Sequence, residues 1–138
     1  MKQRLDHLTI AVPGRGFTDI TDQVRKFVAQ SRINAGLLTL FIQHTSASLL
    51  VQENADPDVL TDLEDAFARL VPRAAGYRHV TEGPDDMPSH IRAALTQTSL
   101  SIPVDAGAPV LGTWQAIYLF EYRDAAHRRV IVMHAIGE

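Results

Sequence analysis

Three histidines are the side chains of this sequence whose surroundings most favour chemistry. His44 ends a run of alternating apolar residues, and His79 and His90 flank a short acidic segment. The chain contains no cysteine, so a metal ion would have to be held by imidazole, carboxylate or carbonyl groups. A site built from His44, His79 and His90 would suit a divalent ion such as zinc.

Each of these histidines also has a simpler structural interpretation. His44 shares one face of its expected strand with Leu40 and Ile42, so it also fits a core histidine bonded to a backbone carbonyl. His90 falls in the first turn of an expected helix, where the positive end of the helix dipole favours the neutral ring that a metal requires. His79 would equally fit an exposed loop. From spacing alone, the metal site and the structural interpretation both stay open.

Hydroxyl and acidic residues near the histidines are the next candidates. Ser46 and Ser48 lie in a turn after the first histidine, where their hydroxyl groups either bind anionic oxygens or stabilise the turn itself. Glu82 and Asp85 lie between the other two histidines. A carboxylate in that segment would act either as a general base or as a helix cap.

The start of the penultimate expected strand offers two more polar candidates, Thr113 and Gln115. They share one face of that strand, opposite Trp114, which is expected in the core. Gln115 and Glu121 are six residues apart, roughly 20 Å at the rise of a strand. One pocket therefore uses both only if a second subunit supplies one of them. Glu121 is expected to form an ordinary surface ion pair with Arg128 across a hairpin.

The composition excludes several classes of protein. With 138 residues, of which 46% are hydrophobic and 21% charged, residues 1–138 are expected to form one soluble domain. A net charge of −3 gives no long-range attraction for nucleic acid or for an anionic membrane. The sequence shows no signal peptide and no apolar run of membrane-spanning length, so a cytoplasmic location is expected.

The hydrophobic pattern alternates between the period of a helix and that of a strand. A first helix is expected to start at Thr18 or Thr21 as the cap and to bury Ile20, Val24, Phe27 and Val28. A second starts at Asp56 and buries Leu60, Leu63, Phe67 and Leu70, and a third covers about residues 87–97. Strands are predicted at residues 2–12, 37–44, 49–53, 99–104, 111–123 and 128–136, the last two as a hairpin. This order predicts an α+β fold with a largely antiparallel sheet and two or three helices.

Several segments together resemble one known family. They are His44-Thr45-Ser46-Ala47-Ser48, Glu53 to Val59, His79 with Glu82-Gly83, Pro84 to Ile91, Leu111 to Gln115, Glu121 and Arg128-Arg129. In their order and spacing these segments are similar to the UPF0047 family, also called YjbQ-like. The resemblance covers nearly the whole chain.

The resemblance implies an antiparallel β sandwich within an α+β domain that assembles as a homotrimer. It also implies a secondary thiamine-phosphate synthase, a transferase that joins a pyrimidine methyl diphosphate to a thiazole phosphate and releases pyrophosphate. The family's pocket lies between subunits and is lined by histidines that sometimes hold a metal ion, and the matching residues are His44, His79 and His90. Asp86 departs from the asparagine more usual in the family and adds a negative charge near this site.

These residues support three hypotheses of function. In the first, zinc at the histidines, or magnesium carried by a diphosphate substrate, neutralises the leaving group, and the substrate is oriented by Ser46, Ser48, Thr113, Gln115 and Arg129. In the second, a metal-dependent hydrolase of a small phosphorylated molecule uses Glu82 or Asp85 as its general base. In the third, a non-catalytic trimer binds a small ligand or a partner protein.

Overall fold

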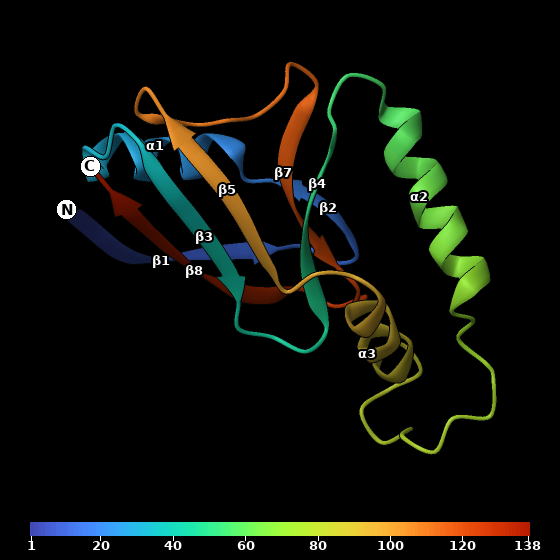
Figure 1. The fold of residues 1–138 in the computed structure, drawn as a ribbon. Helices are drawn as coiled ribbons and strands as arrows, with labels where there is room; N and C mark the ends of the chain where they lie inside the picture. Colours follow the sequence, from blue (N-terminus) through green and yellow to red (C-terminus); the bar gives the residue numbers. More distant parts are fainter.

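Two antiparallel sheets form the body of the computed structural model, which describes all of residues 1–138 (Figure 1). The five-stranded sheet has the order β1 (Lys2–Val12), β8 (His127–Gly137), β3 (Gly36–Ile42), β5 (Ser99–Asp105) and β6 (Ala108–Pro109). The three-stranded sheet has the order β2 (Gly16–Asp19), β7 (Gln115–Glu121) and β4 (Ala47–Glu53). With three helices, this confirms the predicted α+β fold built on an antiparallel sandwich.

The hydrophobic core combines side chains of both sheets, because alternate residues of each strand face inward. Its fully buried members include Leu38, Leu40, Ile42 and Ile131 from the five-stranded sheet and Leu49, Ile117 and Leu119 from the three-stranded sheet. Helix α1 (Thr21–Ser31) adds Val24, Phe27 and Val28 to this core. The predicted caps of α1 are wrong. Ile20 occupies the cap position, and the Asp19 carboxylate accepts the backbone N–H and the hydroxyl of Thr21.

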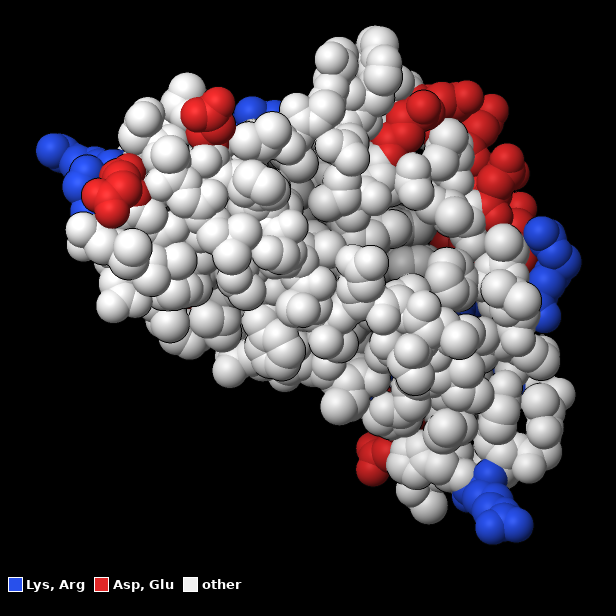
Figure 2. All heavy atoms as spheres, viewed as in Figure 1, with Lys and Arg blue, Asp and Glu red and all other residues white.

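Helix α2 (Pro57–Leu70) starts as predicted but is less buried than predicted. The Asp56 side chain accepts the backbone N–H of Asp58 at 2.9 Å and caps the helix. No residue of α2 is fully buried, and Leu70 is 70% exposed. Figure 1 shows why: α2 stands beside the sheets, and it contacts them through the Phe67 ring, 5.6 Å from that of Phe120. Acidic side chains gather on the outer surface near α2 (Figure 2).

The end of the chain departs from the predicted hairpin. The penultimate strand, β7, begins at Gln115 rather than at residue 111, because Gly112 to Gln115 form a turn closed by the Gln115 N–H on the Gly112 carbonyl. Trp114 lies in this turn and is 62% exposed, so its predicted core position is wrong. Strands β7 and β8 belong to different sheets, and residues 122–126 cross between them. The short strands β2 and β6 were not predicted.

Helix α3 (Asp86–Leu95) begins one residue before the predicted start, after a long segment that follows α2. His90 lies in the second turn of α3 and His79 lies in this segment, so two of the histidines singled out in the sequence belong to this region. None of the three helices has the length and apolar character of a membrane span.

Candidate metal centre

Two histidines and an aspartate converge where the segment after α2 meets the start of α3. His79 lies in the segment, and Asp86 and His90 lie on α3 four residues apart. Residues at this spacing are neighbours on one face of a helix. The fold therefore brings Asp86 and His90 together through local structure, and the return of the segment adds His79.

The three side chains share one carboxylate oxygen. The Nε2 atom of His79 lies 2.7 Å and that of His90 lies 3.1 Å from the same Oδ2 of Asp86. The potential ligand atoms of the three residues all lie within 4.8 Å of one another. Asp86 is buried, whereas the side chains of His79 and His90 are 43% and 33% exposed. The cluster is thus closed on the aspartate side and open to solvent on the imidazole side.

Arg123, which follows β7, holds the other oxygen of Asp86. Its NH1 donates to Asp86 Oδ1 at 2.8 Å, and its Nε donates to Asp85 Oδ2 at 3.0 Å. Burial alone would raise the pKa of Asp86, but the hydrogen bond from His79 and the charges of His90 and Arg123 bring that pKa below its ordinary value. Asp86 is therefore a charged carboxylate at neutral pH, as a metal ligand must be.

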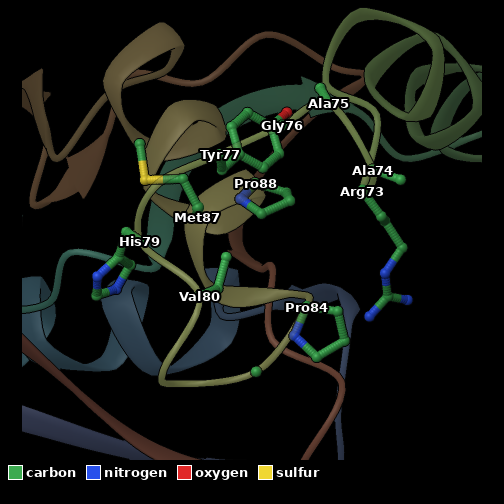
Figure 3. Close-up of a pocket in the computed structure, with 11 residues that line it drawn as sticks. Arg73, Ala74, Ala75, Gly76, Tyr77, His79, Val80, Pro84, Met87 and Pro88 are labelled. Carbon is green, nitrogen blue, oxygen red and sulfur yellow. The ribbon is translucent and has the colours of Figure 1, made fainter.

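A cavity of about 340 Å³ lies between the segment after α2 and the start of α3 (Figure 3). His79 stands at one edge and Arg73 at another, and no acidic side chain lines it. The walls are mostly apolar and include Tyr77, Val80, Pro84, Met87 and Pro88. This cavity adjoins the cluster because His79 belongs to both.

Glu82 and Asp85, predicted as general bases, lie near this cluster in different roles. Asp85 accepts from the Arg123 side chain and from the backbone N–H of Asp124. Burial opposes its ionisation, but these hydrogen bonds lower the pKa of Asp85. Glu82 contributes its carbonyl oxygen to Arg123 at 2.8 Å, and its carboxylate makes no hydrogen bond. Of the two acids, only Glu82 has a carboxylate without a hydrogen-bond partner and thus available as a general base.

His44 is not brought to the cluster. Strand β3 ends at Ile42, and the Nε2 of His44 accepts the backbone N–H of Val130 at 2.8 Å. An Nε2 that accepts places the proton of the neutral ring on Nδ1, so neither nitrogen is left for a metal. Burial first and then the charge of Arg129 lower the pKa of His44. The structural interpretation therefore describes His44 better, with a backbone N–H in place of the expected carbonyl.

Arg129 and Ser46, expected to orient a substrate, form a buried polar group instead. Arg129 pairs with Glu121 through two hydrogen bonds, one of them at 2.6 Å from Nε to Oε1. Its NH2 also donates to the Ser46 hydroxyl at 2.9 Å. Arg129 is 4% and Glu121 0% exposed, so the expected surface pair of Glu121 with Arg128 is wrong. A ligand would reach Arg129 only by breaking this pair.

Ser48 is fully buried in a chain of hydroxyl groups. Its Oγ bonds to the Thr96 hydroxyl, which also bonds to the Tyr122 hydroxyl at 2.9 Å. Every group in this chain has a partner inside the protein, and no buried side-chain polar atom of the structure lacks one. Ser48 therefore has no free hydroxyl to offer a substrate in this conformation.

Thr113 and Gln115 lie at the far end of β7 from the cluster. Glu53 pairs with Gln115 at one end of the β4–β7 ladder, and Ala47 pairs with Glu121 at the other. Arg123 follows the second end, so the length of β7, roughly 20 Å, separates Gln115 from the residues around Asp86. The Gln115 side chain accepts the backbone N–H of Gly112 and closes its own turn.

Sequence reasoning selected His79 and His90, placed Asp86 only as a negative charge near the site, and missed Arg123 as the partner of Asp86. The signal for Asp86 was present: an aspartate and a histidine four residues apart in the first turns of a predicted helix. No local signal existed for Arg123, because the contact joins segments 37 residues apart.

Comparisons with known proteins relate the whole chain to one family. The family model described as UPF0047 protein YjbQ-like matches residues 6–138. A UPF0047 protein of Synechocystis is 49% identical over 99% of this chain and 94% of its own length. The UPF0047 protein YjbQ of Escherichia coli is 46% identical over 95% of this chain and 96% of its own length.

Solved structures show the same fold. The crystal structure of an uncharacterised conserved protein of the yjbq/upf0047 family from Clostridium acetobutylicum superposes with a TM-score of 0.88. It is 34% identical, covering 95% of this chain and 99% of that one. A YbjQ-like protein of unknown function from Sulfolobus solfataricus, 24% identical, superposes with a TM-score of 0.87 over 99% of each chain.

Proposed function

Because this chain belongs to the UPF0047 family of YjbQ-like proteins, and its solved relative from Clostridium acetobutylicum is described as uncharacterised, we propose its function from its own side chains. The protein is a metal-dependent enzyme that acts on a small anionic molecule. His79, Asp86 and His90 hold the ion, and the neighbouring cavity holds the substrate. The observation that supports this proposal is the convergence of two imidazole nitrogens on one buried carboxylate oxygen.

The donor set fits zinc better than magnesium. Two histidines and one carboxylate are the ligands of zinc sites that keep a position open for substrate or water, whereas magnesium prefers oxygen ligands. Ligand atoms around tetrahedral zinc lie roughly 3.3 Å apart, as bonds of about 2.0–2.1 Å require. The Nε2–Oδ2 distances of 2.7 and 3.1 Å therefore need only a small widening. When bound, the ion would supply a Lewis acid for an anionic oxygen of the substrate.

The cavity indicates the kind of substrate. Its apolar wall suits a ring or another flat apolar body, and Arg73 is its only charged lining residue. A guanidinium recognises carboxylate or phosphate oxygens through paired hydrogen bonds. Arg73 is now paired with Asp124 at the surface, and its side chain is 44% exposed. An anionic substrate would compete with Asp124 for it.

Within this proposal, the specific reaction is the one that the resemblance implies. A thiamine-phosphate synthase joins two ring compounds that carry a diphosphate and a phosphate, which matches a cavity with an apolar wall and an arginine. Hydrolysis of a phosphorylated molecule is the alternative, favoured by the free carboxylate of Glu82, which would serve as base. Release of pyrophosphate only when both ring compounds are present would support the transferase. Release of phosphate from one compound alone would support the hydrolase.

The outer face of the five-stranded sheet supports self-association, and the family resemblance implies that the assembly is a homotrimer. Leu5, Leu37 and Phe41 are 58%, 41% and 46% exposed on this face, which carries charged residues only towards its ends. Figure 2 shows mainly uncharged residues over β3 and β5. We expect sedimentation velocity to give a trimer for the wild type and a monomer for Phe41→Arg. A monomeric wild type would contradict this part of the proposal.

Elemental analysis tests the metal centre directly. We expect close to one zinc ion per chain in the wild type and none in His79→Ala or His90→Ala. His44→Gln is the matched control, because its amide oxygen is able to accept the Val130 N–H, and it should keep its zinc. Loss of zinc in His44→Gln would return His44 to the ligand set. A wild type that takes up no zinc after reloading would overturn the proposal.

A further inference from the structure

We infer that Arg123 is the positioning residue of the proposed metal centre, fixing the orientation in which the Asp86 carboxylate faces the two imidazoles. This inference rests on the proposed function. Arg123 does not contact the open side of the cluster, and it acts only through Asp86. Its NH1 donates to Oδ1 of Asp86 at 2.8 Å, so that Oδ2 is left for His79 and His90.

One guanidinium organises the whole turn before α3. Three different nitrogen atoms of Arg123 reach three different acceptors: Oδ1 of Asp86, Oδ2 of Asp85 and the carbonyl oxygen of Glu82, at 2.8, 3.0 and 2.8 Å. The planar fork of arginine presents its donors in directions that a single ammonium group cannot match. Lysine at this position would keep the charge but lose most of the geometry.

The backbone beside Arg123 is itself fixed from the protein interior. The N–H of Arg123 donates to Oε2 of Glu121 at 3.1 Å, and Glu121 is fully buried against Arg129. On the other side, the N–H of Asp124 donates to Oδ2 of Asp85 at 2.9 Å. The position of Asp86 is therefore set by the end of β7 and its buried ion pair. The segment that carries His79 is largely exposed and contributes less to it.

Without this contact the Asp86 carboxylate would be held only at Oδ2, by the two imidazoles, and it would be free to turn about that oxygen. Groups that hold metal ligands without touching the metal typically change metal affinity by 10–100-fold when they are removed. We therefore expect Arg123→Gln to weaken zinc binding by about 10–100-fold, and Arg123→Lys to weaken it nearly as much.

The test measures zinc affinity by chelator competition in the full chain, together with the visible absorption spectrum of the cobalt-substituted protein. The spectrum reports coordination geometry, which a purely structural role of Arg123 would not alter. Arg78→Gln is the matched control, because Arg78 is an exposed arginine of the segment that carries His79 and makes no side-chain hydrogen bond. We expect wild-type affinity and spectrum for this control, and both changed for Arg123→Gln.

Three results would contradict the inference in distinguishable ways. Zinc binding by the wild type with unchanged affinity and spectrum in Arg123→Gln would overturn the positioning role alone. A lower melting temperature of the metal-free variant with unchanged zinc affinity would also overturn it and leave a structural role. A wild type that binds neither zinc nor cobalt would overturn the proposed metal centre and this inference with it. If Arg123→Gln does not fold, Arg123→Lys and Asp85→Asn decide by the same measurements.

Discussion

The buried pair of Glu121 and Arg129 and the open cluster around Asp86 are built from similar groups but have opposite surroundings. Arg129 and Glu121 are 4% and 0% exposed, and each carboxylate oxygen already accepts a hydrogen bond. In the open cluster the imidazoles of His79 and His90 are partly exposed and face one oxygen that both share. A closed set of partners contributes to stability, whereas convergent ligands beside solvent leave room for an ion.

Removal of one partner from the buried pair should have the largest effect. Arg129→Met would leave the carboxylate of Glu121 buried without its cation, which typically costs about 3–5 kcal/mol. Urea unfolding measures this loss. His79→Ala in the open cluster is the matched change and should lower the free energy of unfolding by less than about 1 kcal/mol. Similar losses for both variants would remove the distinction between the two regions.

His44 lies beside the buried pair, and its protonation should make the stability of this region depend on pH. Burial and the charge of Arg129 lower its pKa below the ordinary 6.5, so the unfolded chain takes up the proton first as the pH falls. The stability that depends on neutral His44 is fully present above pH 6.5 and is lost as the pH falls from 6.5 toward the lower folded pKa. Urea unfolding of metal-free protein on both sides of pH 6.5 should show a smaller decrease for His44→Gln. An equal decrease in wild type and variant would contradict this assignment.

The smallest loss of stability is expected for an exposed aromatic residue near β7, and a buried aromatic residue of the same strand provides the comparison. Trp114 is 62% exposed in the turn before the strand, so Trp114→Ala should cost less than about 1 kcal/mol. Phe120 is 0% exposed within the strand, and its replacement by alanine should cost about 3–5 kcal/mol. Thermal unfolding of the two variants compares them directly. A large loss for Trp114→Ala would mean that another chain covers it.

The fold was predictable from sequence for those elements that are determined by their own residue pattern and capping residues. The strand at residues 2–12 and the helix that starts after Asp56 match the structure because alternation and an Asp-Pro start need no distant partner. The predicted hairpin failed because two neighbouring strands look the same in sequence whether they pair with each other or enter different sheets. Trp114 was misplaced because the turn from Gly112 to Gln115 is closed by a backbone hydrogen bond and by the Gln115 side chain, which the alternation of residues does not reveal.

The candidate site was predictable only in part. His79 and His90 were selected by type and by their acidic surroundings, and they do lie together. Ser46 and Arg129 carry the right groups for binding an anion, but sequence does not reveal that Glu121, from another strand, already uses Arg129. Contacts between distant segments therefore decide which polar groups are buried with a partner and which remain available to a ligand.

The pairing of β1 with β8 has a consequence for how the protein is made. These strands pair along their whole length, from Lys2 opposite Gly137 to Val12 opposite His127, and β8 also separates β1 from β3. During translation, β1 and one edge of β3 therefore have no strand to pair with until β8 has left the ribosome. Such distant pairings fold slowly, and unpaired strand edges invite aggregation. The yield of folded protein should thus depend on chaperones that protect these edges during synthesis.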